Sequence, residues 1–90
     1  MPKFRKKPVV IEAVQWDGRT EPLIEMLPED PNQPGYTTWP EHFTLNNDVL
    51  YITTLEGEMR CDIGSWVIKG VNGEFYPCAN DIFEKTYEAV

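Results

Sequence analysis

The sequence predicts a small α+β domain in which a strongly curved antiparallel sheet, or a small open barrel, carries one short helix. Three features of the chain lead to this fold class. Turn residues recur at short intervals through its second half, which is typical of a β-meander. A segment rich in β-branched residues lies at 8–16, and a short amphipathic segment lies at 21–27. All 90 residues are expected to form a single domain.

The first half of the chain holds one predicted strand and one predicted helix. The strand over 8–16 is largely apolar on both faces, so we expect it to be central in the sheet. Thr20 is placed to cap a helix over 21–27. Pro28 ends this helix, because proline cannot continue it.

A Pro-rich loop is predicted over 28–40. Its four prolines exclude a helix or a central strand. A loop of this length in a compact domain is typically mobile or functional. Tyr36 and Trp39 either pack this loop on the core, which is the favoured interpretation, or are displayed for a ligand.

The second half reads as a meander of five short strands, over 41–45, 49–54, 58–63, 66–69 and 74–77. The last two are predicted to form a hairpin closed by Asn72-Gly73. Asparagine and glycine both tolerate the positive φ that a two-residue hairpin turn requires. Bulky and aromatic residues flank this turn on both sides.

The C-terminal residues are predicted to add a short helical turn over 80–85. Asn80 is placed as its N-cap, and Ile82 and Phe83 are expected to face the core. Residues 86–90 are then predicted to form a final short strand.

Charge is unevenly distributed along the chain. With 8 basic and 15 acidic residues the net charge is −7, which opposes direct binding to nucleic acid and to anionic membranes. A basic arm at 1–7 contributes +4 of this total through Lys3, Arg5, Lys6 and Lys7, so the remainder carries −11.

The N-terminus shows no signal peptide, and no segment is long and apolar enough to span a membrane, so a cytoplasmic location is expected. Cys61 and Cys78 are then expected to stay reduced and to pack as small hydrophobes.

The residue types favour a non-enzymatic role. His42 is the single histidine, and no motif pairs it with Cys61 or Cys78 as a nucleophile and base. Two isolated cysteines and one histidine leave a zinc site short of ligands, and no glycine-rich phosphate loop is present. Solvated surface explains the acidic residues better than a magnesium site does. No metal or cofactor is therefore expected.

A site for a small ligand is predicted instead. A nucleotide requires aromatic faces for its base and cations for its phosphates. The candidate residues are Trp66, Tyr76, Trp39 and Tyr36 for stacking, and Arg60, Lys69 and Arg5 for charge. For Trp66 and Tyr76 the alternative is a place in the core.

Several segments carry a resemblance: KFRKKPVVIEAVQW at 3–16, TLEG at 54–57, GSWVIKGVNGEFYPC at 64–78 and DIFEKTYE at 81–88. Together they resemble a family of small proteins encoded by tailed bacteriophages and prophages. The Pro-rich loop takes no part in this resemblance. The family often has Pro-Gly-Asp followed by Trp or Tyr where this chain has Ile63-Gly64-Ser65-Trp66, so the acid of that motif is missing at Ser65.

The resemblance implies a phage accessory protein made in the bacterial cytoplasm, with no established reaction. Phages also encode small β-rich proteins that sequester the nucleotide messengers of host immune systems, and by this analogy we expect ligand sequestration. Two alternatives stay open. The acidic surface could occupy a nucleic-acid-binding protein of the host, or an edge strand at 41–45 or 86–90 could pair copies of the chain into a structural homo-oligomer.

Overall fold

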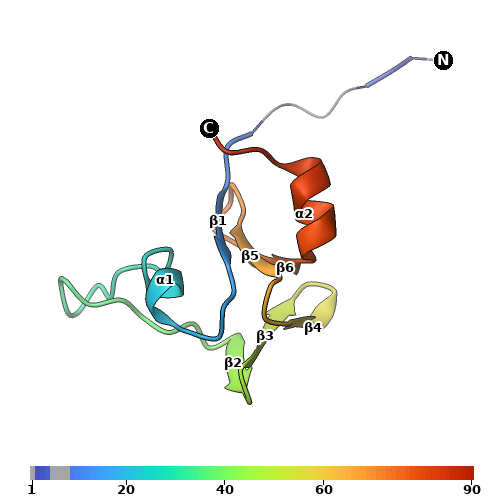
Figure 1. Ribbon diagram of the computed structural model, residues 1–90. Coiled ribbons are helices and arrows are strands. Elements are labelled where there is room, and N and C mark those ends of the chain that lie inside the picture. Colours follow the sequence, from blue (N-terminus) through green and yellow to red (C-terminus); the bar gives the residue numbers. More distant parts are fainter. Residues whose placement is uncertain (1, 5–8) are drawn as a thin grey trace.

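The computed structural model describes residues 2–4 and 9–90, which form two three-stranded antiparallel sheets and two short helices (Figure 1). The first sheet has the order β1-β5-β6, with β1 Glu12–Gln15, β5 Trp66–Lys69 and β6 Phe75–Cys78. The second has the order β2-β3-β4, with β2 Phe43–Asn46, β3 Val49–Thr54 and β4 Gly57–Cys61. The predicted α+β class with mostly antiparallel strands is confirmed. The described strands make two sheets and no closed barrel.

Helix α1 Glu21–Ile24 follows β1, and helix α2 Asn80–Thr86 follows β6. In Figure 1 they lie on opposite sides of the first sheet. A helix is confirmed at the predicted place, but it is shorter than the predicted 21–27: α1 ends at Ile24, and two backbone hydrogen bonds continue the chain as turns as far as Leu27. Thr20 takes the N-cap position, but its hydroxyl makes no capping bond. Among the described residues no helix is both long and apolar enough to cross a membrane.

Both faces of the first sheet are covered, and alternation along its strands assigns each residue to one of them. Val14, Val67 and Phe75 face the main core between the sheets. The residues that alternate with them face α2. On that side the Trp66 ring stacks on Phe83, with ring centres 4.0 Å apart. In β1 this alternation places Val14 toward the core and Ala13 toward the α2 side.

The second sheet contributes Leu50, Ile52 and Cys61 to the same core. Phe43 from β2 and Phe75 from β6 meet edge to face at 5.1 Å, which is a favourable aromatic geometry. This pair joins the two sheets.

Trp16 fastens the first sheet to the turn of the second. Its side chain is 1% exposed, and its indole N–H donates to the main-chain oxygen of Asp48 at 2.8 Å. Asn47 and Asp48 have φ values of 49° and 66°, so they form the two-residue turn with positive φ that joins β2 to β3.

The predicted central strand at 8–16 is wrong in position. β1 spans only Glu12–Gln15 and pairs with β5 alone, so it is an edge strand. Val9 and Val10 precede it and are exposed. A strand can carry apolar residues on both faces without having a paired strand on each side. The residue pattern shows which faces are apolar, and it does not show how many strands pair with the segment.

The predicted two-residue turn at Asn72-Gly73 is also wrong. Only Gly73 has a positive φ, of 80°. Its N–H donates to the Gly70 oxygen at 3.0 Å, so the turn spans four residues. The Glu74 carboxylate accepts the N–H of Asn72 at 3.0 Å and holds this longer turn. Glycine at its last position supplies the left-handed residue that a turn of this kind needs.

The C-terminus differs from prediction because α2 continues to Thr86, and residues 87–90 form no strand. The proposed edge pairing through 86–90 therefore loses its strand, whereas β2 is an edge strand of the second sheet. Ile82 does not face the core but is 56% exposed. Phe83 does pack inward, on Trp66.

Asn80 is not the N-cap of α2, because Ala79 holds that position. The Asn80 side-chain oxygen instead accepts the indole N–H of Trp66 at 2.9 Å and the Gln15 amide at 3.3 Å. An asparagine suited to capping is thus used to connect the helix to two strands.

The Pro-rich loop at 28–40 contains a single isolated bridge, between Glu29 and Thr37. Trp39 packs as the favoured interpretation predicts: its ring meets Phe43 edge to face at 5.6 Å and its N–H donates to the Phe43 oxygen. Tyr36 does not pack, since it is 67% exposed.

Candidate ligand groove between the sheets

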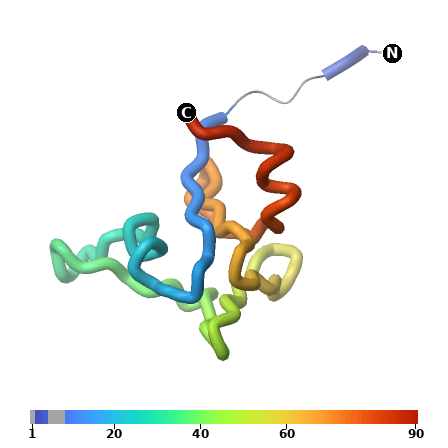
Figure 2. Tube along the Cα trace, viewed as in Figure 1, coloured from blue at the N-terminus to red at the C-terminus, as the bar shows by residue number. Residues whose placement is uncertain are grey.

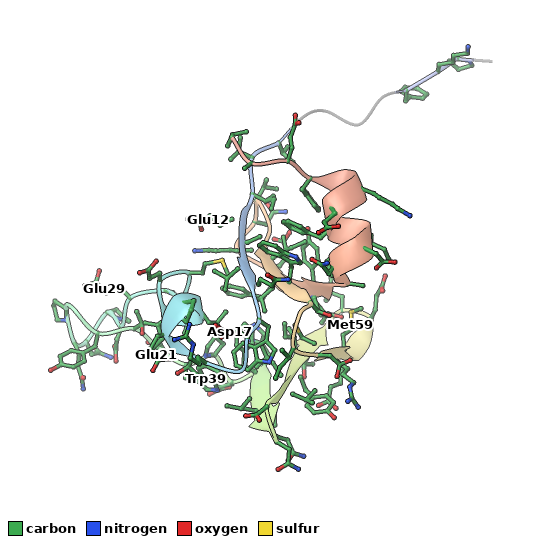
Figure 3. The ribbon with its side chains drawn as sticks, viewed as in Figure 1. Glu12, Asp17, Glu21, Glu29, Trp39 and Met59 are labelled. Carbon is green, nitrogen blue, oxygen red and sulfur yellow. The ribbon has the colours of Figure 1, made fainter. Side chains whose placement is uncertain are left out.

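A groove of about 660 Å³ opens where the β3–β4 hairpin of the second sheet meets β6 of the first. We call it the inter-sheet groove. Its lining residues are His42, Thr53, Thr54, Leu55, Glu56, Met59 and the segment 73–77. Figure 3 shows Met59 on β4, well away from Trp39 on the other side of the second sheet.

The floor of the inter-sheet groove is apolar. Phe75 is buried at its base, and Met59 is half-buried beside it. Leu55 lies in the tight turn between β3 and β4 and is fully exposed at the rim. An aromatic ring backed by a flexible thioether suits the flat face of a ring-bearing ligand.

The rim of the groove carries carboxylates and hydroxyls. Glu56 and Glu74 lie on facing hairpins, and the lining includes no lysine or arginine among the described residues. The Thr54 hydroxyl donates to the Gly57 oxygen at 3.0 Å, so this hydrogen bond stabilises the turn between β3 and β4. His42 joins the aromatic cluster, with its ring 4.9 Å from Phe43. The fixed charges of the groove are therefore negative.

Tyr76 is the one predicted site residue that lines the groove. Its side chain alternates with Phe75, so it shares the α2 face of the sheet with Ile68. Burial, together with the neighbouring Tyr87, raises the pKa of Tyr76 from 10.0 to about 12. This phenol is therefore neutral at pH 7.

The structure does not bring the predicted aromatic residues together. Trp66 stacks on Phe83 and donates to Asn80 on the α2 side of the first sheet. Trp39 packs on Phe43, and Tyr36 stands exposed in the loop.

The predicted cations are likewise dispersed. Arg60 donates to Asp62 at 2.7 Å, and this carboxylate holds the pKa of the Arg60 guanidinium above its usual range. Lys69 lies 3.8 Å from Glu12 across the β1–β5 pair. Arg5 is outside the described residues. Arg60 and Lys69 thus each have a carboxylate neighbour, and they do not converge on one cavity.

A second, smaller pocket of about 270 Å³ lies on the α2 side of the first sheet. We call it the tail pocket. The segment that leads into β1 and the C-terminal residues form its sides, with Trp66 and Phe83 between them. Its lining is mostly apolar.

The cysteines are poorly suited to nucleophilic chemistry. Both thiols are free, and neither lines the inter-sheet groove with His42. Burial raises the pKa of Cys61 from 9.0 to about 12, and Asp62 adds to the effect. Burial also raises the pKa of Cys78. The reactive species is the thiolate, which these environments disfavour. Within the described part of the chain, no group of three or more metal-ligating side chains is assembled.

Because the Cys61 thiol is buried, we expect the free energy of unfolding to decrease at high pH. The unfolded chain loses this proton near pH 9.0, whereas the folded chain keeps it until about pH 12. Between these values the unfolded state binds fewer protons, so the free energy of unfolding falls as pH rises. Urea midpoints should fall less steeply above pH 9 in Cys61→Ala than in the wild type. Equal slopes in the two proteins would contradict this role of Cys61.

Sequence reasoning missed the groove. Met59, Phe75 and Leu55 carry no functional motif, and they converge only because two hairpins from different sheets dock. His42 was considered as a catalytic residue and as a zinc ligand, and not as part of a ligand groove. Compared with models of protein families, with curated proteins and with solved structures, the chain matches none of them.

Proposed function

We propose that this protein is a non-enzymatic binding protein, and that the inter-sheet groove takes a small ring-bearing ligand without net negative charge. The groove itself carries this proposal. Its volume of about 660 Å³ falls within the roughly 300–1,000 Å³ usual for small-molecule sites. An apolar floor with a few polar groups at the rim is the usual composition of such sites.

The charge of the ligand follows from the rim. Glu56 and Glu74 are the fixed charges there, and the whole chain carries −7. Two unit charges about 4 Å apart interact by roughly 1 kcal/mol in bulk water and by more near a protein surface. An ammonium group beside the ring of the ligand therefore strengthens binding, whereas a carboxylate or phosphate at that place weakens it.

A phage accessory role, expected from the resemblance, and a nucleotide messenger, expected by analogy with other small phage proteins, stay predictions. A nucleobase fits the apolar floor of the groove. Its phosphates would face Glu56 and Glu74 unless they extended outside toward other parts of the chain. Occupation of a basic host protein by the acidic surface also stays a prediction, and its complexes should dissociate as salt rises.

Tryptamine and indole-3-acetate test the proposal, because they share one ring and differ in the sign of their charge. We expect tryptamine to shift the NMR amide resonances of Leu55, Met59 and Phe75, and to bind about tenfold more tightly than indole-3-acetate, which is a difference of about 1.4 kcal/mol. Adenosine and a cyclic dinucleotide extend the comparison to nucleobases with and without phosphate.

Two matched variants locate the binding. Thr53→Trp places a ring in the groove, whereas Thr44→Trp places the same ring on the neighbouring strand outside it. Both threonines are exposed, so neither change disturbs the core. We expect Thr53→Trp to weaken tryptamine binding at least tenfold, because its ring occupies space that the ligand needs. We expect Thr44→Trp to leave tryptamine binding unchanged. Absence of tryptamine binding, or equal binding by both variants, would contradict the proposal.

A further inference from the structure

The described N-terminal residues include an aromatic side chain without a place in the fold. Phe4 is 94% exposed and stands next to Lys3, in the basic arm at 1–7. In Figure 2 the described N-terminal segment extends away from the two sheets. The apolar ring of Phe4 is therefore available for contact with a partner.

The chemistry of this arm complements the inter-sheet groove. The arm offers a ring beside positive charges, and the groove offers an apolar floor beside Glu56 and Glu74. The arm contributes +4, and the rest of the chain carries −11. Two copies are thus attracted when the arm of one approaches the body of the other.

We propose that the inter-sheet groove of one copy receives the Phe4 ring from the arm of a second copy, so that self-association and small-ligand binding exclude each other. This inference rests on the proposed function, because both assign the groove as the binding site. Two copies that exchange arms fill both grooves at once and close into a dimer. The tail pocket does not fit as well, because its lining holds one carboxylate, Glu88, and mostly apolar residues.

Sedimentation equilibrium of the full chain tests the dimer. We expect a concentration-dependent dimer in the wild type that weakens as salt rises, because the arm and the groove rim carry opposite charges. Phe4→Ala should weaken dimerisation by about 30-fold or more, as loss of a central aromatic anchor does. Val90→Ala is the matched control, since Val90 is a fully exposed apolar residue at the other end of the chain.

The groove side is tested by mixing variants. Thr53→Trp should also lose the homodimer, because its groove is filled. A mixture of Phe4→Ala and Thr53→Trp should regain association, since one partner keeps a groove and the other keeps an arm. A wild type that is monomeric at every concentration, or a dimer that Phe4→Ala does not weaken, would overturn the inference.

Failure of the inference can be told from failure of the proposed function. Tryptamine binding by a monomeric protein would overturn arm exchange alone. A dimer that depends on Phe4, in a protein that binds neither tryptamine nor adenosine, would support arm exchange and overturn the small-ligand proposal. If both hold, tryptamine should dissociate the dimer, and Phe4→Ala should bind tryptamine more tightly than the wild type does.

Discussion

Replacing Trp16 by alanine is expected to lower the free energy of unfolding by about 3–5 kcal/mol, the usual cost of truncating a large buried aromatic side chain. Trp16 is the largest of the fully buried side chains. The substitution also removes its hydrogen bond to Asp48, and with it the connection between the first sheet and the β2–β3 turn. A chain of 90 residues typically has a total stability of about 5–13 kcal/mol, so this loss is a large part of the whole.

Urea unfolding followed by circular dichroism measures the loss, with Trp66→Ala as the matched control. Trp66 is the same residue type but is only half-buried, against α2. We therefore expect a smaller loss for Trp66→Ala. A cost below about 1 kcal/mol for Trp16→Ala, or one no larger than that for Trp66→Ala, would contradict the central place of Trp16 in the core.

Replacing Phe43 by alanine is expected to cost about 3–4 kcal/mol and to weaken the contact between the two sheets. Phe43 is buried, and its ring meets the rings of Trp39, His42 and Phe75 edge to face. Loss of this ring should therefore also perturb the inter-sheet groove, whose base is Phe75.

A double-mutant cycle with Phe75→Ala isolates the contact between the sheets. The coupling energy of an edge-to-face pair is typically about 0.5–1.5 kcal/mol. Leu23→Ala paired with Phe43→Ala is a control within the same core, because Leu23 belongs to α1 rather than to a sheet. Additive losses for Phe43 and Phe75 would contradict the proposal that this pair joins the sheets.

The local elements were largely predictable from the sequence. Strands β3 and β5 have the predicted bounds, 49–54 and 66–69. Both are short runs rich in β-branched and aromatic residues followed by a glycine-containing turn, and these signals are local to the hairpin. The turn at 70–73 was harder to predict, because its length depends on a hydrogen bond that the backbone N–H of Asn72 donates to the Glu74 carboxylate.

The pairing of elements was not predictable in the same way. The division into two sheets depends on which strands meet across long stretches of sequence, as β1 meets β5. The residue pattern of the β1 segment is apolar on both faces, and this does not distinguish a central strand from an edge strand. At the C-terminus, helix α2 likewise extends to Thr86, one residue beyond the prediction. Its Phe83 stacks on Trp66, a contact between residues that are distant in the sequence.

The candidate site could be predicted least of all. Residue chemistry singled out Arg60 and Lys69, but strand geometry places a carboxylate beside each of them. Met59 and Phe75 carry no sequence signal of function, and their place at the groove exists only after β4 and β6 dock. A prediction from residue types finds groups able to bind, and it does not find which of them are left available.

The most direct test of the inter-sheet groove is a set of intermolecular NOEs between the indole protons of tryptamine and the protein. We expect NOEs to the methyl groups of Leu55, Met59 and Thr53, which line the groove on its β3–β4 side. NOEs confined to Val10 and Ala89 would place the ligand in the tail pocket. That result would contradict the assignment of the inter-sheet groove as the binding site.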